Sequence, residues 1–172
     1  MRKRIRADRD FYRTPLKAVN LAKPLINSEL NWWEPCAGDG AISKNIKEIT
    51  YASDIFPMHE TIHQLDMLNC DKPQNIDAVI TNPPFCFQFE LLDRCLYEWR
   101  IPALLLLRLE SFSGQKRNYY TKNLLKMHII SSLIKFETED GRIVNGNGTL
   151  RCAWCLFVPE KVPFTETRWV VY

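Results

Sequence analysis

The strongest constraint on the fold is a repeated alternation of short apolar runs with longer amphipathic stretches. Seven runs rich in β-branched, aromatic or leucine side chains are candidate strands: residues 31–34, 51–54, 62–65, 78–81, 103–107, 129–135 and 152–158. Four amphipathic stretches are candidate helices: residues 14–26, 41–48, 87–99 and 116–126. Strands that alternate with helices form a largely parallel sheet covered by crossover helices. We therefore expect an α/β fold.

Length and composition indicate one globular domain. The chain has 172 residues, of which 46% are hydrophobic and 25% charged, and one domain of this size can bury a substantial core. The longest apolar run spans residues 101–107, whereas a membrane-spanning helix needs about 20 apolar residues. No apolar stretch follows the basic start, so a secretory signal is not expected. We expect a single domain over residues 1–172, in the cytoplasm and without membrane contact.

Positive charge is concentrated at the amino terminus. The net charge is +3, but residues 1–17 carry +5 and the remaining residues carry −2. Basic arms of this kind commonly meet nucleic acid. A solvated terminus without a partner is the alternative interpretation.

The six cysteines predict no metal site or disulfide framework. Cys152 and Cys155 form the one Cys-x-x-Cys pair, and no second pair completes a four-ligand metal site. Their surroundings, from Arg151 to Val158, have the composition of a buried strand. We expect buried, reduced thiols and no metal.

A glycine-containing turn lies between the first candidate strand and the helical stretch that follows it. Residues 34–40 read Glu-Pro-Cys-Ala-Gly-Asp-Gly, and glycine allows both a sharp turn and close approach of a ligand to the main chain. The Glu34 carboxylate would suit a ligand that carries an ammonium group. The sequence has neither Gly-x-Gly-x-x-Gly nor a Lys-Ser/Thr pair after the glycines, which argues against a dinucleotide site or a P-loop. A simple strand-to-helix turn is the alternative.

Two carboxylates follow the next two candidate strands. Asp54 lies 20 residues after Glu34, a position suited to accept hydrogen bonds from ribose hydroxyls. Ile55 and Phe56 would provide an apolar bed for an adenine ring, and Asp66 could accept from an adenine amine. Each acid taken alone could equally be a helix cap or a solvated loop residue.

The sharpest motif is Thr81-Asn82-Pro83-Pro84-Phe85, directly after the strand at residues 78–81. The prolines stiffen the backbone and remove donors, so the Asn82 amide oxygen and the Pro83 carbonyl could accept both hydrogens of an aromatic amine. Phe85 could stack on the base that bears the amine, with Phe87 or Tyr12 as a second wall. The position at a strand's carboxyl end favours a binding function over a simple turn.

Together these segments resemble the class I S-adenosylmethionine-dependent methyltransferases, in the amine-methylating branch with an [N/D/S]PP[Y/F] motif. The resemblance covers residues 10–158 and implies a Rossmann-like seven-stranded sheet, mostly parallel with one antiparallel strand and with helices on both faces. Residues 10–15, Asp-Phe-Tyr-Arg-Thr-Pro, resemble the Phe-x-x-Thr-Pro box of adenine-specific DNA methyltransferases. The order of the boxes and the short chain are similar to small phage-encoded adenine methylases.

The resemblance also implies site residues. The cofactor S-adenosyl-L-methionine would be held by Tyr12, Thr14, Pro15, Glu34, Cys36, Ala37, Gly38, Asp54, Ile55, Asp66 and Asn82. The target amine would be held and methylated by Asn82, Pro83, Pro84 and Phe85. This chemistry needs no metal and no covalent intermediate, because it depends on positioning and electrostatics.

The implied function is methylation of the adenine N6 amine in DNA. A duplex target would have to be flipped out of the stack. RNA amine methylation is an alternative, as are methylation of a protein glutamine and a non-catalytic module that only binds the cofactor. We expect a nucleic-acid partner, with DNA favoured over RNA, and a location in the cytoplasm, that of the host if the chain is phage-encoded.

We expect no separate target-recognition domain within residues 1–172, because the predicted sheet leaves little length for one. Residues 108–126 carry basic and aromatic side chains that could contact phosphates and bases, although a solvated basic helix face is an equal alternative. A turn at residues 141–148 could present another cation. The candidate nucleic-acid contacts are Arg108, Lys116, Arg117 and Arg142. A partner protein that supplies target recognition is a further possibility.

Overall fold

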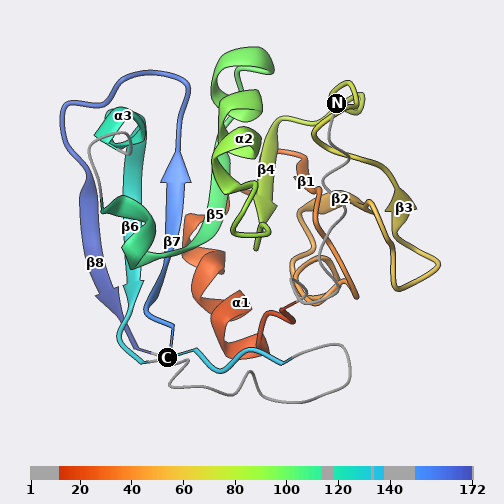
Figure 1. Ribbon diagram of the computed structural model, residues 1–172, viewed down its shortest axis with the longest axis horizontal. Helices are drawn as coiled ribbons and strands as arrows, with labels where there is room; N and C mark the ends of the chain where they lie inside the picture. Colours follow the sequence, from red (N-terminus) through yellow and green to blue (C-terminus); the bar gives the residue numbers. More distant parts are fainter. Residues whose placement is uncertain (1–11, 114–117, 133, 138–149, 172) are drawn as a thin grey trace.

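The sheet is continuous through all the strands of the computed structural model, which describes residues 12–113, 118–132, 134–137 and 150–171. Its order is β3-β2-β1-β4-β5-β7-β6-β8 (Figure 1). The strands are β1 (Trp32–Glu34), β2 (Ile49–Asp54), β3 (His63–Gln64), β4 (Ala78–Thr81), β5 (Ala103–Arg108), β6 (Leu124–Ile130), β7 (Cys152–Phe157) and β8 (Glu166–Val170). The α/β class expected from the sequence is confirmed.

Strand β7 is the one strand of this sheet that runs against its neighbours. It pairs antiparallel with both β5 and β6, whereas β1 to β5 pair in parallel and β8 pairs in parallel with β6. In Figure 1 the arrow of β7 points opposite to those of β6 and β8. The expected mostly parallel sheet with one antiparallel strand is therefore confirmed, but the described residues form eight strands rather than seven.

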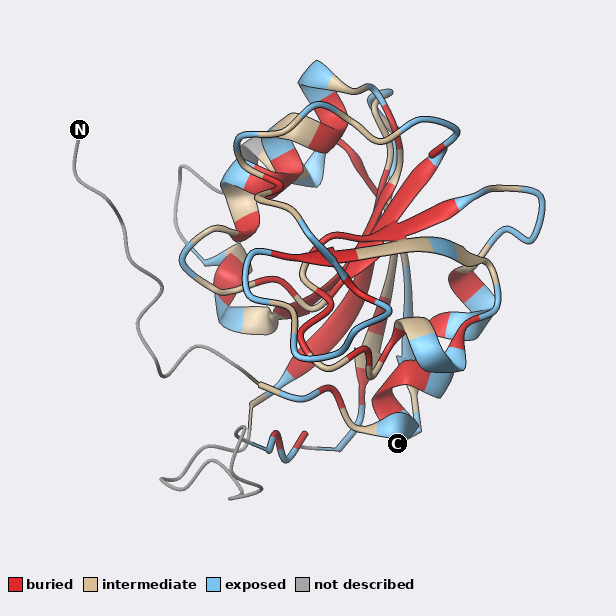
Figure 2. Cartoon of the chain, turned by 90° about the vertical axis from the view of Figure 1, so that its right-hand side faces the viewer, coloured by how far each residue is buried: buried red, intermediate tan, exposed pale blue. Residues whose placement is uncertain are grey.

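Both faces of the central strands are buried, because their side chains alternate between two cores. On β5, Leu104 and Leu106 pack into a cluster with α1, while Leu105 and Leu107 pack into a second cluster with α2. All four are at most 1% exposed. Strands covered on both sides have apolar residues at every position, which explains the unbroken leucine run. The buried strands cross the middle of the molecule in Figure 2.

Helices cover both faces, as expected. The stretch predicted at 14–26 forms α1 and η1, and the stretch predicted at 87–99 forms α2 and a π-helical segment, η3. Their bounds, with those of the shorter helical segments, are α1 (Leu16–Ala22), η1 (Lys23–Leu25), η2 (Ser43–Asn45), α2 (Gln88–Asp93), η3 (Arg94–Glu98), η4 (Leu109–Phe112) and α3 (Asn118–Thr121). No helix in the described ranges has the length and apolar character needed to cross a membrane.

The helix expected at residues 41–48 is wrong, since only the single turn η2 forms there. The Asn45 side-chain amide donates to the Ala41 carbonyl at 2.9 Å. The Asn45 backbone N–H donates instead to the Ile42 carbonyl at 3.0 Å. The side chain thus takes the acceptor that an α-helix would use, which is the usual way that asparagine competes with helix formation.

The prediction for residues 116–135 is also wrong in its boundaries. Helix α3 stops at Thr121, and the strand expected at 129–135 begins instead at Leu124. The Asn123 amide donates to the carbonyls of Val158 and Pro159 at 2.9 and 3.0 Å, which ties the chain to the end of β7. Pairing of β6 with β7 on one side and β8 on the other overrides the local helix preference.

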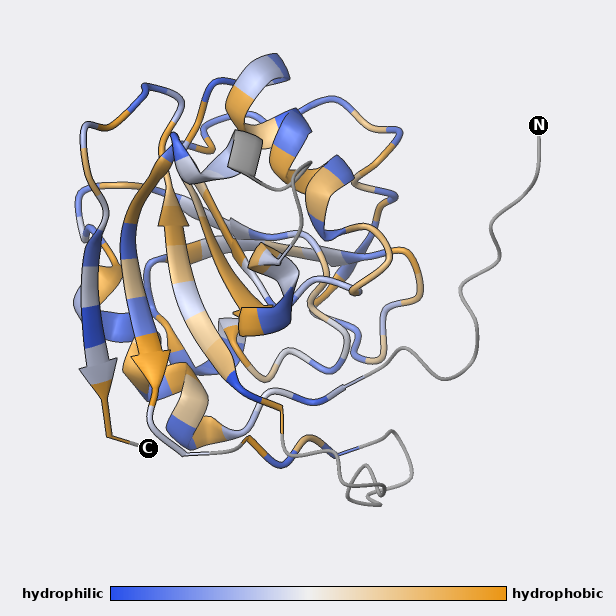
Figure 3. Ribbon diagram, turned by 60° about the vertical axis from the view of Figure 1, so that its left-hand side comes forward, coloured by the Kyte–Doolittle hydropathy of each residue, from blue (hydrophilic) through white to orange (hydrophobic). Residues whose placement is uncertain are grey.

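Strand β8 was not predicted from the sequence. It forms the sheet edge beside β6 and is more hydrophilic than the inner strands (Figure 3). Its three central residues, Thr167, Arg168 and Trp169, are all exposed. A strand that buries so little carries no clear apolar pattern, which is why it escapes sequence analysis.

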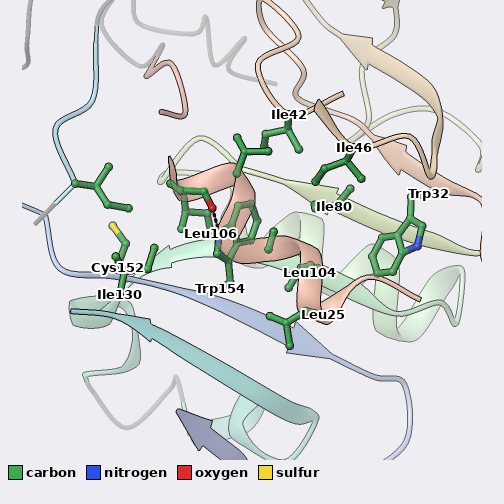
Figure 4. Close-up of a cluster of buried hydrophobic side chains, with 14 of the residues drawn as sticks. Leu25, Trp32, Ile42, Ile46, Ile80, Leu104, Leu106, Ile130, Cys152 and Trp154 are labelled. Atoms are coloured by element: carbon green, nitrogen blue, oxygen red, sulfur yellow. Dashed lines mark hydrogen bonds between the residues drawn. The ribbon is translucent and has the colours of Figure 1, made fainter. Parts of the chain in front are cut away.

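Trp154 joins β7 to α1 across the first core. Its indole N–H donates to the Ala18 carbonyl at 2.8 Å, and the side chain has no exposed surface (Figure 4). This buried contact fixes where α1 lies against β7. The Thr14-Pro15 segment immediately before α1 is positioned by the same contact.

We expect Trp154→Phe to lower the free energy of unfolding by about 2–4 kcal/mol, because it removes a buried hydrogen bond and leaves a void beside α1. The measurement is urea-induced unfolding. Trp169→Phe is the matched control: Trp169 is 71% exposed, and a change within about 0.5 kcal/mol is expected there. Equal losses for the two variants would contradict this account of the core.

Candidate active site at the carboxyl edge of the sheet

The parallel strands bring the sequence-predicted residues to one edge of the sheet. Carboxyl ends of neighbouring parallel strands share an edge, and ligands of open α/β sheets bind there. Four strands end on residues of interest: β1 on Glu34, β2 on Asp54, β4 on Thr81 immediately before Asn82, and β5 on Arg108. Segments far apart in the sequence therefore meet at this edge.

The glycine-containing turn is held by Asp54. One oxygen of this 2% exposed carboxylate accepts from the Gly38 backbone N–H and the other from the Phe56 N–H, both at 2.8 Å. Gly38 and Gly40 have φ values of +55° and +80°, which side-chain-bearing residues rarely adopt. The turn thus depends on glycine, as predicted, and Asp54 braces it from the neighbouring strand.

Glu34 is a buried carboxyl group whose hydrogen bonds come from Ser43, through both its backbone and its side chain. It is 1% exposed, and its Oε2 accepts from the Ser43 backbone N–H at 2.8 Å. Burial raises the pKa of Glu34 from 4.5 to about 8, since desolvation outweighs the Ser43 contact, and the nearby Asp39 and Asp54 add to the rise. A cation that entered beside this carboxyl group would favour its ionised form.

Asn82 is oriented by the segment that precedes α1. Its Nδ2 donates to the Tyr12 carbonyl at 3.2 Å and to the Thr14 hydroxyl at 3.1 Å. A backbone carbonyl can only accept, so the amide nitrogen must face it. The Oδ1 atom therefore points the other way, and no described residue donates to it. Asn82 presents a free acceptor from a fixed orientation.

A pocket lies between these segments. It is lined by residues 12–14 of the amino-terminal segment, by six residues of the glycine-containing turn and its surroundings, and by residues 82–84 after β4. The pocket thus combines the predicted residues Tyr12, Thr14, Glu34, Cys36, Ala37, Asn82, Pro83 and Pro84. Pro15 lines the adjoining hollow.

Phe85 lies between two side chains rather than in the pocket wall. The Tyr12 ring is 5.6 Å from the Phe85 ring, centroid to centroid, at a tilt of 39°. The guanidinium carbon of Arg108 is 3.5 Å from the centroid of the same ring. Tyr12 is thus the aromatic neighbour that the sequence suggested, and Arg108 contacts the very residue predicted to stack on the target.

Several predicted residues lie outside the pocket lining. Gly38 forms part of the glycine-containing turn, and its N–H is bound by Asp54. Ile55 follows β2 and is 39% exposed. Asp66 caps a turn: its oxygens accept from the Leu68 N–H at 3.0 Å and from the Asn69 amide at 2.6 Å. Lys116, Arg117 and Arg142 lie outside the described residues.

Arg13 and Asp39 are pocket residues that sequence analysis missed. The Arg13 Nε donates to the Asp39 carboxylate at 2.5 Å, and the Arg13 N–H donates to the Glu137 carbonyl at 2.9 Å. Both side chains line the pocket and the hollow beside it. Only their positions in the sequence could have indicated a role in the pocket, because Arg13 lies between two predicted site residues and Asp39 lies between the two glycines.

The Cys-x-x-Cys pair lies in the sheet. Cys152 packs with the α1 cluster and Cys155 with the α2 cluster, so the two thiols lie on opposite faces and cannot share one metal ion. Burial raises the pKa of Cys152 to about 12 and raises that of Cys155 further. Both are buried thiols, as expected.

No protein-family model and no curated protein matches the chain. The solved structures that share its fold include the following two. The 23S rRNA methyltransferase ErmE superimposes with a TM-score of 0.58 at 15% identity, covering 88% of this chain and 71% of ErmE. A dimethyladenosine transferase from Plasmodium falciparum superimposes with a TM-score of 0.56 at 13% identity, and the match covers 87% of this chain and 63% of the transferase. The chain has the Rossmann-like fold of class I methyltransferases.

The Glu34 environment predicts a stability that falls with rising pH. The folded state holds the Glu34 proton up to a pKa of about 8, whereas the unfolded chain releases it near 4.5. The contribution of protonated Glu34 to the free energy of unfolding is therefore complete below pH 4.5. It is lost as pH rises toward 8, at up to about 1.4 kcal/mol per pH unit. Glu34→Gln should be progressively more stable than wild type from pH 5.5 to pH 8, in thermal melts at matched ionic strength.

The control for this experiment is Glu29→Gln, which removes an exposed carboxylate. It should follow the wild-type curve at every pH. A constant difference between Glu34→Gln and wild type across this pH range would contradict the assignment of a protonated Glu34.

Proposed function

We propose that the chain transfers a methyl group from S-adenosyl-L-methionine to the exocyclic N6 amine of adenine in nucleic acid. The observation that carries the proposal is the orientation of Asn82, whose amide oxygen is left as a free acceptor beside the pocket. An aromatic amine is a poor nucleophile because its lone pair is delocalised into the ring. Acceptors that hold both of its hydrogens favour the developing positive charge on nitrogen during attack.

The second acceptor would be the Pro83 carbonyl. Asn82, Pro83 and Pro84 line the pocket together, and the two prolines restrict the backbone that carries this carbonyl. The amine would be held between two oxygens, so its direction of approach would be fixed. Positioning of this kind supplies much of the acceleration in reactions that need no covalent intermediate.

The residues present fit the proposed cofactor. Its sulfonium supplies the methyl group, and its amino-acid portion carries an ammonium group. The pocket places the buried Glu34 carboxyl group and the Arg13 guanidinium among its lining residues, which suit an ammonium and a carboxylate respectively. Ile55 and Phe56, 39% and 56% exposed beyond β2, would contact the adenine portion.

The fold neighbours favour RNA as the polymer. One is named a 23S rRNA methyltransferase and the other a dimethyladenosine transferase. DNA, which the sequence favoured, stays the second candidate because Asn82-Pro83-Pro84-Phe85 and Thr14-Pro15 resemble the boxes of DNA adenine methyltransferases. Both polymers require the same site, since the adenine amine is identical in each.

The test is transfer of a labelled methyl group to RNA, single-stranded DNA and duplex DNA in parallel, followed by digestion and separation of the nucleosides. We expect label in N6-methylated adenosine, with RNA as the better polymer. Label in N6-methyldeoxyadenosine alone would select the DNA candidate. Label confined to a protein, or no label despite cofactor binding, would overturn the proposal.

Asn82→Ala should lower the transfer rate on the order of 10²-fold or more, the usual cost of removing one group that stabilises developing charge. Cofactor affinity, measured by calorimetry, should fall far less than the transfer rate, because Glu34 and the glycine-containing turn are untouched and only the contacts to Tyr12 and Thr14 are lost. Asn27→Ala is the matched control, since it removes an exposed asparagine outside the pocket, and its rate should equal that of wild type. A fully active Asn82→Ala enzyme would contradict the role given to this amide.

A further inference from the structure

The guanidinium of Arg108 covers one face of the ring predicted to hold the target base. Its carbon lies 3.5 Å from the Phe85 ring centroid, close to the separation of about 3.4 Å between successive bases in a nucleic-acid stack. Arg108 ends β5 and Phe85 follows β4, and these strands are neighbours in the sheet. A planar cation therefore occupies the place of a stacked base.

This cation has no fixed partner other than the ring. The Arg108 Nε is buried and has no hydrogen-bond acceptor among the described residues. No carboxylate in the described ranges lies within ion-pair distance of the guanidinium, although five other ion pairs are seen there. The charge of Arg108 is thus uncompensated in the structure, and a phosphate would compensate it.

The other neighbour of Phe85 is anchored. The Tyr12 carbonyl accepts from Asn82 at 3.2 Å, and the Tyr12 ring packs against Phe136 at 6.0 Å between centroids. Moving the Tyr12 ring would break its contact with Phe136, and moving the Tyr12 backbone would release the Asn82 amide that the proposed reaction needs. Arg108 is held by none of these contacts. The face of Phe85 that can be vacated without dismantling the site is the one under Arg108.

We propose that Arg108 is a displaceable stand-in for the target base. When an adenine stacks on Phe85, the guanidinium leaves the ring and binds a phosphate of the same strand. The proposal rests on the proposed function and deepens it, because it names the group that opens the site to a base carried on a phosphate backbone. Base–aromatic stacking offsets the loss of the cation–π contact, and the charge-assisted contact with the phosphate makes the exchange favourable.

The test separates the base from its phosphates. Binding of labelled adenosine, which carries no phosphate, is measured by equilibrium dialysis with saturating S-adenosylhomocysteine to block the cofactor site. Arg108→Ala should bind adenosine about threefold or more tightly than wild type, since no cation–π contact has to be broken. The same variant should bind a short adenine-containing oligonucleotide more weakly, with a salt dependence reduced by about one phosphate contact.

Arg151→Ala is the matched control. Arg151 is an exposed arginine immediately before β7, whose first residue pairs with Arg108. It removes the same charge from the same edge without touching Phe85, so its adenosine affinity should equal that of wild type. Arg108→Lys, which keeps the charge but not the planar group, should also bind adenosine more tightly than wild type.

Three outcomes would overturn the proposal. Weaker adenosine binding by folded Arg108→Ala would show that the guanidinium supports the ring rather than occupying the base's place. Unchanged adenosine binding would show that it does neither. If either result is found and the wild-type protein still methylates nucleic acid, the proposed function stands and only the role of Arg108 is wrong. The third outcome is a wild-type protein that methylates neither RNA nor DNA, which would overturn the proposed function and the role of Arg108 together.

Discussion

The hydrogen bond from the Asn82 amide to the Tyr12 carbonyl is the contact on which the rest of the site depends. It links two segments 70 residues apart, and it leaves one direction for the amide oxygen because a carbonyl cannot donate. The same contact closes the amino-terminal side of the pocket and seats Tyr12 against Phe85. The sheet supplies the other half of the arrangement, since Trp154 positions α1 and with it the segment that carries Tyr12 and Thr14.

The two buried carboxyl groups at this edge differ in their hydrogen-bond partners. Asp54 accepts from two backbone N–H groups, one of them in the glycine-containing turn, so its charge is satisfied by the chain itself. Glu34 accepts from the backbone and side chain of Ser43, yet burial raises its pKa to about 8. A carboxyl group in that condition is stabilised by an incoming cation. Asp54 therefore braces the turn, whereas Glu34 is a carboxyl group whose ionised form an entering cation would favour.

Sequence patterns predicted the sheet and the site segments better than the connections. The continuous apolar runs of β5 and β7, and the positions of Glu34, Asp54 and Asn82 at strand ends, follow directly from local pattern. The turn at residues 41–48 depended on one side chain, Asn45, which competes for a helical acceptor. Strand β8 is half exposed and exists through pairing with β6. The contacts of Arg13 with Asp39 and of Arg108 with Phe85 are long-range, and no local pattern encodes them.

The central claim is that the Asn82 side-chain oxygen accepts a hydrogen bond from the target amine. A crystal structure of the protein with S-adenosylhomocysteine and an adenine-containing oligonucleotide tests it most directly. The account predicts that the adenine N6 lies within hydrogen-bond distance of Asn82 Oδ1 and the Pro83 carbonyl, about 2.7–3.2 Å from each, with Nδ2 still on the Tyr12 carbonyl. An N6 atom bound elsewhere, or an Asn82 amide turned away from Tyr12, would contradict it.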